Sequence, residues 1–220
     1  TTNFILTMMI EKGMSFDEAL KIAQEKGYAE KDPTADVEGH DACRKVCILA
    51  SLAFGKHVYP NQVETEGITN ITLEDVSYIE NAGGVIKLLG QIKYINDNEI
   101  AAFVSPTVVY NGSQLASVKD VFNAILVRGD AVGDVCFYGP GAGKLPTASA
   151  VVADIIDCAK HSERKKIFGW GAGNEDYVVD YKERIEMPFY VRAKATPAEI
   201  NAKFLSLIHI SEPTRHSLIS

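Results

Sequence analysis

The chain has 220 residues, of which 46% are hydrophobic and 23% charged, as in ordinary globular proteins, so we expect a folded core. Its 29 acidic and 22 basic residues give a net charge of -7, which argues against a nucleic-acid partner. Four cysteines without a C-x-x-C pair argue against a disulfide scaffold and predict a reduced, cytoplasmic protein. The apolar runs are too short for a membrane helix.

Two helices are predicted at the start of the chain. Apolar residues recur at helical spacing over residues 3–12. Ser15 and Glu18 form the S-x-x-E pattern of a capping box, and Gly27 is a typical helix end, so a second helix is predicted between them. The first residue is Thr1 rather than Met, and we expect the chain to begin inside a longer protein.

An acidic loop and a third helix follow. Residues 28–40 are rich in carboxylates, and a helix is predicted over residues 41–54 with Gly55 at its end. The apolar stripe of this helix is expected to consist of Ala42, Val46, Leu49, Ala50 and Ala53. A shorter helix is predicted after Thr72, because acidic side chains occupy its first turn.

Strand patterns begin near residue 85. Short β-branched or aromatic runs between turn residues predict strands over 85–92, 100–105 and 133–138, in an antiparallel or mixed sheet. A strong helix is predicted over residues 147–160, with its apolar side chains on one face.

The last fifty residues are expected to belong to other units. Residues 169–174 are glycine-rich and predict a turn or linker. A strand over 187–194 and a helix signal at 196–199 would open another domain. Residues 205–220 resemble the translated sequence of a transposon adapter used to prepare DNA sequencing libraries, so we leave them out of the expected fold.

The acidic loop and the helix behind it form the first candidate site. Lys45 lies one helical turn after Asp41, on the same face. A lysine beside carboxylates acts as a general acid or base when burial and its neighbours tune its pKa; at a surface the same pair is only a salt bridge. Spacing alone favours the salt bridge. The carboxylates of this region are Glu30, Asp32, Asp36, Glu38 and Asp41.

No metal site is predicted. The loop has carboxylates at some calcium-ligand positions, but Val37 stands where glycine is required and Cys43 where glutamate is required. Cys43 and Cys47, and Cys158 near His161, lack further ligands at suitable spacing, so we interpret these cysteines as core thiols.

A glycine-rich turn is the second candidate site. Residues 137–147 have the pattern of a strand, a turn and a helix start, with Gly139, Gly141 and Gly143 in the turn. Such a turn lets backbone N–H groups approach an anion or an electron-poor ring. The spacing matches neither a P-loop nor a G-x-G-x-x-G fingerprint, and a purely structural turn is an equal alternative.

Four segments together are far more specific than any one of them. They are residues 1–6 (TTNFIL), 27–45 (GYAEKDPTADVEGHDACRK), 66–68 (EGI) and 137–143 (FYGPGAG). The chain resembles homoserine dehydrogenase over about residues 1–180. The resemblance implies an α/β (α+β) catalytic and dimerisation domain, built as a mixed β-sheet covered by helices on one face. Residues 181–204 would be a linker and the start of a truncated ACT-like domain, and residues 205–220 an adapter-derived artefact.

The resemblance also implies an activity and a set of site residues. The family transfers a hydride reversibly between L-homoserine and L-aspartate 4-semialdehyde, with NADP or NAD, in threonine and methionine biosynthesis. The family's catalytic lysine falls on Lys45, which would take or return the hydroxyl proton. Gly141 and Gly143 would approach the nicotinamide. The implied substrate-binding residues are Thr1, Glu30, Asp36 and Asp41. Lys31 departs from the small or proline residue expected beside them.

Further expectations concern parts outside this chain. The resemblance implies that NADP or NAD is bound mainly by a domain before Thr1, so that the isolated chain is inactive. A homodimer or higher homo-oligomer is expected, without nucleic-acid or membrane partners, and no metal is assigned. An alternative from another class stays open: a non-catalytic module for amino-acid sensing or oligomerisation.

Overall fold

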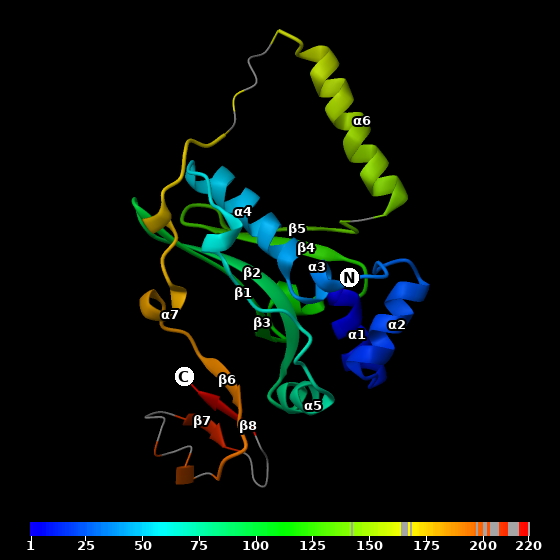
Figure 1. Ribbon diagram of the computed structural model, residues 1–220, viewed down its shortest axis with the longest axis vertical. Helices are drawn as coiled ribbons and strands as arrows, with labels where there is room; N and C mark the ends of the chain where they lie inside the picture. The colour runs from blue at the N-terminus through cyan, green and yellow to red at the C-terminus, as the bar shows by residue number, and fades with distance from the viewer. Residues whose placement is uncertain are drawn as a thin grey trace.

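The computed structural model describes residues 1–141, 143–163, 167, 169–196, 198–199 and 202, and the backbone of 207–210 and 216–219. Its main body is a sheet with helices packed against it (Figure 1). The helices are α1 (Thr2–Lys12), α2 (Phe16–Glu25), α3 (Thr34–Val37), α4 (His40–Phe54), α5 (Leu73–Asn81), α6 (Lys144–Lys160) and α7 (Tyr181–Arg184). The strands are β1 (Glu64–Thr65), β2 (Gly84–Asn96), β3 (Glu99–Tyr110), β4 (Asn123–Gly129), β5 (Gly133–Gly139), β6 (Phe189–Arg192), β7 (Leu207–Ile210) and β8 (His216–Ile219).

The central sheet has the strand order β1–β3–β2 and is mixed, as predicted. β2 and β3 form a long antiparallel pair, in which Gly84 lies opposite Tyr110 and Asn96 opposite Glu99. β1 joins β3 in parallel. The strands predicted over 85–92 and 100–105 lie inside β2 and β3, which extend further, whereas the strand predicted over 133–138 lies inside β5, in a separate sheet. Two-residue β1 is too short to give an alternating pattern.

Helices of the first eighty residues cover one face of this sheet. Side chains of β2 such as Ile86 pack in one core cluster with α1, α2 and α5. Ala102 and Val104 of β3 pack in a second cluster with α4. Gly90 lets α4 come close, because a Cβ there would lie 2.3 Å from Cγ2 of Val46. Burial of this shared apolar surface holds the helices on the sheet.

The prediction that helices cover only one face is incomplete. Ala101 and Phe103 alternate with the residues that face α4, and they pack with Tyr181 of α7. The rings of Phe103 and Tyr181 stack with centroids 3.9 Å apart. This packing continues as far as Met187, which lies beyond residue 180, where a domain boundary was expected. The boundary itself stays a prediction. A four-residue helix is too short to show apolar periodicity, so α7 was not predicted.

Local capping signals correctly placed the early helices. The hydroxyl of Ser15 accepts the N–H of Glu18, and the Glu18 carboxylate accepts the N–H of Ser15. Thr72 and Asp75 make the same reciprocal arrangement at the start of α5. Gly55 ends α4 in the left-handed conformation, with φ 73°. The expected helices over 3–12 and 41–54 are therefore confirmed.

The expected apolar stripe of α4 is wrong by a small rotation. Leu49 and Ala53 face solvent. Ser51 is buried because its hydroxyl donates to the carbonyl of Cys47 (2.7 Å) and accepts the N–H of Val58 (2.9 Å). Thiols and a bonded hydroxyl thus fill places that the pattern assigned to alanine and leucine. The buried residues are Cys43, Val46, Cys47, Ala50 and Ser51, which confirms two of the predicted core thiols.

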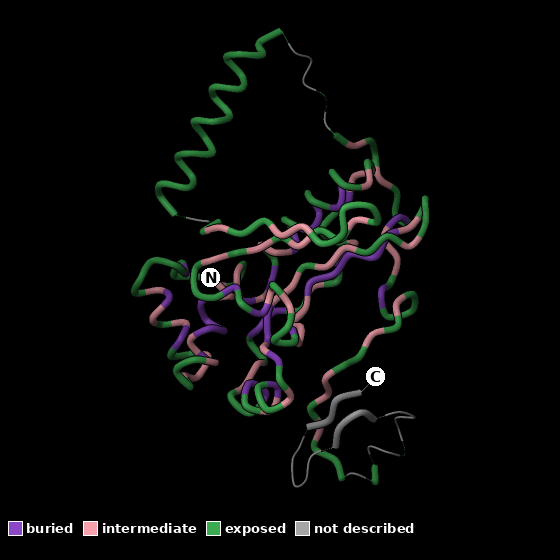
Figure 2. The backbone as a smooth tube through the Cα atoms, turned by 180° about the vertical axis from the view of Figure 1, so that it is seen from behind, coloured by how far each residue is buried: buried purple, intermediate pink, exposed green. Residues whose placement is uncertain are grey.

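A hairpin and a long helix project from the main body. Among the strands that the structure describes, β4 and β5 pair only with each other, and β4 was not predicted. All residues of α6 are exposed, and in Figure 2 the helix stands apart from the rest of the described chain. Cys158 lies on α6, so its interpretation as a core thiol is wrong. Among the described residues, no helix is long and apolar enough to cross a bilayer.

The C-terminal strands form a third sheet, in the order β6–β8–β7. β6 lies within the predicted strand 187–194, and residues 198 and 199 are helical, while residues 197 and 200 lie outside the described part. β7 and β8 fall within residues 205–220. The adapter origin of that segment stays a prediction, which the flanking gene sequence can decide.

Candidate active site

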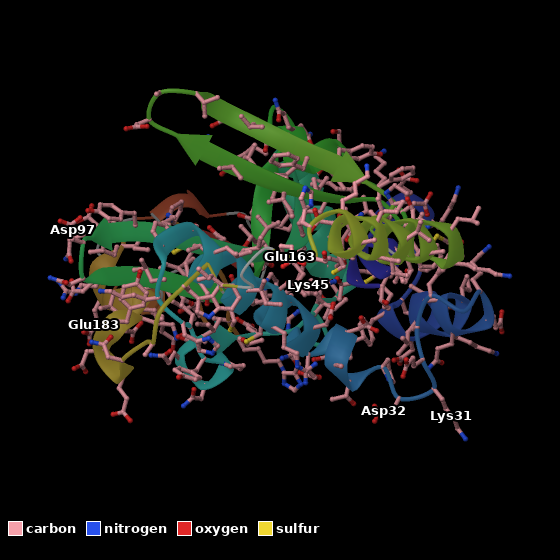
Figure 3. All side chains as sticks on the ribbon, turned by 90° about the horizontal axis from the view of Figure 1, so that it is seen from above. Lys31, Asp32, Lys45, Asp97, Glu163 and Glu183 are labelled. Carbon is pink, nitrogen blue, oxygen red and sulfur yellow. The ribbon has the colours of Figure 1, made fainter. Side chains whose placement is uncertain are left out.

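The acidic loop contains a short helix, α3, that sequence patterns did not reveal. The backbone N–H and the hydroxyl of Thr34 both donate to Oδ1 of Asp32, at 3.1 and 2.6 Å. These hydrogen bonds lower the pKa of the Asp32 carboxyl. Asp32 therefore orders the entry to α3, and its exposed side chain points outward from the loop (Figure 3).

Two glycines form the corner between α3 and α4. Gly39 has φ 81°, a left-handed conformation that favours glycine, and it lies directly before α4. Gly67 packs beneath the corner, where a Cβ would lie 2.1 Å from the carbonyl oxygen of Val37. The N–H of Ile68 donates to the same carbonyl, at 2.8 Å. The EGI and acidic-loop motifs thus meet in space and fix the first turn of α4.

Lys45 and Asp41 form an ion pair on α4. Nζ of Lys45 lies 2.7 Å from Oδ2 of Asp41, and the two side chains are 69% and 46% exposed. The sequence argument for a catalytic lysine required burial, and within this chain Lys45 is open to solvent. Figure 3 shows Lys45 on α4, at a distance from Lys31 and Asp32 of the acidic loop.

Thr1 lies close to this pair. Its hydroxyl donates to the carbonyl of Tyr28 at 2.6 Å. Its backbone nitrogen lies within electrostatic range of the charged side chains of Asp36, Asp41 and Lys45. The structure therefore brings together four of the five residues expected to handle substrate and proton: Thr1, Asp36, Asp41 and Lys45.

Glu30 lies in the same loop but is not joined to this group by any contact in the described part of the chain. Its side chain is exposed, and its backbone carbonyl accepts a hydrogen bond from Nε2 of Gln24 at 3.0 Å. The bond fixes the backbone at Glu30 and leaves its carboxylate open to a ligand.

The second candidate site lies between β5 and α6. Gly143 precedes α6 with φ 119°, and no side chain caps the first turn of this helix. A Cβ at Gly141 would lie 3.0 Å from Nδ2 of Asn123, so a side chain there would displace its neighbour. The first turn of α6 can therefore present backbone N–H groups to an anion or an electron-poor ring. Ala142, between the two glycines, lies outside the described residues.

Sequence reasoning missed two residues that link these places. Lys87 is buried on β2 and donates to Oδ1 of Asn3 at 2.9 Å. Asn3 in turn donates to the carbonyl of Phe122, directly before β4, at 3.0 Å. The only sequence signal was a lysine inside the apolar run Val85–Leu89, where a charge is unexpected.

In the described residues, no three metal-ligating side chains cluster.

Comparisons with known proteins decide the family. The family model described as homoserine dehydrogenase matches residues 1–156. The chain is 40% identical to the homoserine dehydrogenase of Bacillus subtilis over 212 residues, which is 96% of this chain and 46% of that protein. The chain belongs to the homoserine dehydrogenase family. The homoserine dehydrogenase of Synechocystis is 48% identical over 160 residues, or 71% of this chain and 37% of that protein.

Solved homoserine dehydrogenases share the fold. The Thiobacillus denitrificans structure superposes with a TM-score of 0.83 at 37% identity, over 99% of this chain and 54% of that one. A hyperthermophilic archaeal mutant, solved in complex with NADPH, has a TM-score of 0.58 at 29% identity, over 76% of this chain and 46% of that one. The expected fold class is confirmed. The chain spans about half the length, or less, of these family members.

Proposed function

We propose that this chain is the substrate-binding and catalytic half of an NAD(P)-dependent homoserine dehydrogenase. The reaction interconverts L-homoserine and L-aspartate 4-semialdehyde, in threonine and methionine biosynthesis. The observation that carries the proposal is the Lys45–Asp41 pair, 2.7 Å apart on an open face of α4 beside Thr1, in a chain of this family.

The residues of the pair have complementary roles. In the oxidation, the neutral amine of Lys45 takes the proton from the substrate hydroxyl through Nζ. The carbon that bears this hydroxyl loses the hydride at the same time. In the reduction, the Lys45 ammonium returns the proton to the aldehyde oxygen. Asp36 and Asp41 place negative charge where the amino group of the substrate would bind, and Asp41 also orients Lys45. We propose that Thr1 and Glu30 complete the substrate site.

The cofactor would lie at the start of α6. When bound, NADP or NAD supplies the hydride acceptor or donor at its nicotinamide ring. Gly141 and Gly143 fit close approach of such a ring, and the NADPH complex of an archaeal relative supports this cofactor class. The apolar side chains exposed on α6 support a domain that packs there and binds most of the nucleotide. These side chains include Val151, Val152, Ile155 and Ile156.

We further propose a homodimer in which β4 and β5 take part. Ile125 lies opposite Phe137 in this hairpin, and Val127 projects from the same face as Ile125. All three side chains are exposed in the single chain.

The thiols of Cys43 and Cys47, reduced in the core, support a cytoplasmic location.

The test uses the full-length gene product, with homoserine and NADP or NAD. The wild-type protein should reduce the nucleotide only when homoserine is present. Lys45→Ala should lower kcat by about 10²–10⁴-fold, the usual contribution of a general acid or base. Lys21→Ala, an exposed lysine on α2, is the control. Undiminished turnover in Lys45→Ala would remove Lys45 from the mechanism.

The same experiment distinguishes the non-catalytic alternative. A sensing or oligomerisation module would show no nucleotide reduction with homoserine in the wild-type protein. Calorimetric titration with threonine would then give binding that does not depend on a nucleotide.

A further inference from the structure

Lys87 is a buried charge outside the proposed catalytic group. It is 6% exposed, and Nζ donates to Oδ1 of Asn3 and to the carbonyl of Val118. The charged groups that act on it are Lys119 and Glu11, which pair with each other at 2.6 Å. In the described part of the chain, no carboxylate pairs with Lys87. An ammonium group is costly to bury, so a role beyond filling space is indicated.

Asn3 accepts this hydrogen bond and also donates hydrogen bonds to the segment before β4. Its Nδ2 donates to the carbonyls of Asp120 (3.2 Å) and Phe122 (3.0 Å). One turn further along α1, the hydroxyl of Thr7 donates to the carbonyl of Asn3 and accepts the N–H of Asp120 at 3.1 Å. These bonds hold Asp120 at φ 57°, a conformation that residues other than glycine rarely adopt. The first turns of α1 and residues 118–122 thus form one bonded unit.

This unit touches both halves of the proposed reaction site. On the nucleotide side, the ring of Phe122 stacks on that of Tyr138, with centroids 5.0 Å apart. The side chain of Asn123 lies against Gly141, which we propose contacts the nicotinamide. On the substrate side, α1 begins directly after Thr1. A shift between α1 and β4 would therefore change the distance between the two reactants.

We propose that Lys87 is a positioning residue, which sets the substrate side of the site relative to the nicotinamide side through Asn3 and residues 118–122. The inference rests on the proposed function. Hydride transfer requires close alignment of donor and acceptor, and a displacement of about 1 Å can lower the rate by about 10²-fold. Asp36 and Asp41, which we propose bind the substrate amino group, lie on α3 and α4 outside this unit, so removal of Lys87 should change kcat more than substrate affinity.

The test compares Lys87→Met with Lys93→Met, which removes an exposed lysine from the same strand. Both are made in the full-length gene product and assayed with homoserine where circular dichroism shows each to be fully folded. For Lys87→Met, kcat should fall about tenfold or more, while KM for homoserine changes by less than about threefold. Lys93→Met should match the wild type in both constants.

Asn3→Asp provides a second test that does not remove the lysine. The new carboxylate still accepts from Lys87 but cannot donate to the carbonyls of Asp120 and Phe122, so kcat should again fall with KM retained. If Lys87→Met does not fold, Asn3→Asp carries the test alone. The inference is overturned if Asn3→Asp keeps wild-type kcat, or if a folded Lys87→Met does. A wild-type protein that does not oxidise homoserine refutes the proposed function instead, before any variant is compared.

Discussion

Lys45 and Asp41 lie one helical turn apart on α4, with Nζ and Oδ2 separated by 2.7 Å. Both side chains are substantially exposed, and an exposed pair of this kind contributes only about 0.2–1 kcal/mol to folding. The pair therefore adds little to stability, and the role that we propose for Asp41 beside Thr1 and Asp36 is in substrate binding.

Asp41→Asn should separate these two roles. Loss of a charged hydrogen bond of about 1.5–3 kcal/mol to the substrate amino group would raise KM for homoserine by about 10–100-fold. The free energy of unfolding should change by less than about 1 kcal/mol. Steady-state kinetics of the full-length gene product and urea unfolding measure the two effects, with Asp17→Asn on α2 as the control. An unchanged KM would refute the assignment of Asp41.

What the sequence predicted correctly was local. The capping box at Ser15 involves residues three apart, the acidic side chains that indicated the helix after Thr72 lie in its own first turn, and the Lys45–Asp41 pair spans one helical turn. The contact between Lys87 and Asn3 joins positions 84 residues apart, and no spacing rule could show it. α3 and α7 were missed because four residues are too few for periodicity. The buried face of α4 was misjudged because a small polar side chain such as that of Ser51 can be buried when it is hydrogen-bonded.

Gly67→Ala should disturb the corner that carries Asp36 and Asp41. The added Cβ would lie 2.1 Å from the carbonyl oxygen of Val37, so the backbone must move. Overpacking of this kind costs about 1–3 kcal/mol, or more where backbone atoms clash. Gly112→Ala is the matched control, because no atom lies within 4 Å of its added Cβ. Urea unfolding should show a lower midpoint for Gly67→Ala only, and equal midpoints would contradict the prediction.

Lys87 should make stability depend on pH. Burial, with a smaller contribution from Lys119, lowers the pKa of Lys87 from 10.5 to about 8, and Glu11 opposes the shift. Between these values the unfolded chain binds more protons than the folded one, so stability attributable to Lys87 rises with pH. The shift corresponds to about 3 kcal/mol. The difference in unfolding free energy between the wild type and Lys87→Met should therefore move in favour of the wild type from pH 7 to pH 10. A difference that does not change with pH would show that the charge of Lys87 does not destabilise the folded protein.

Asp75 attaches β6 to the main body. Asp75 is buried at the start of α5, where its Oδ1 accepts the hydroxyl of Tyr190 at 2.7 Å. Its Oδ2 accepts the N–H of Thr72 and pairs with Arg192. One carboxylate thus caps a helix and also holds a strand that is more than a hundred residues away in sequence.

Arg192→Met should loosen β6, because the buried Asp75 carboxylate then loses its cationic partner. Loss of this charge-assisted hydrogen bond to a buried carboxylate should cost about 1.5–3 kcal/mol, and hydrogen exchange at residues 189–192 should become faster. Arg128→Met is the matched control: Arg128 pairs with Asp134 at 2.6 Å, but that carboxylate is 39% exposed, against 3% for Asp75. If the two substitutions lower the free energy of unfolding equally, burial of Asp75 does not determine how β6 is held.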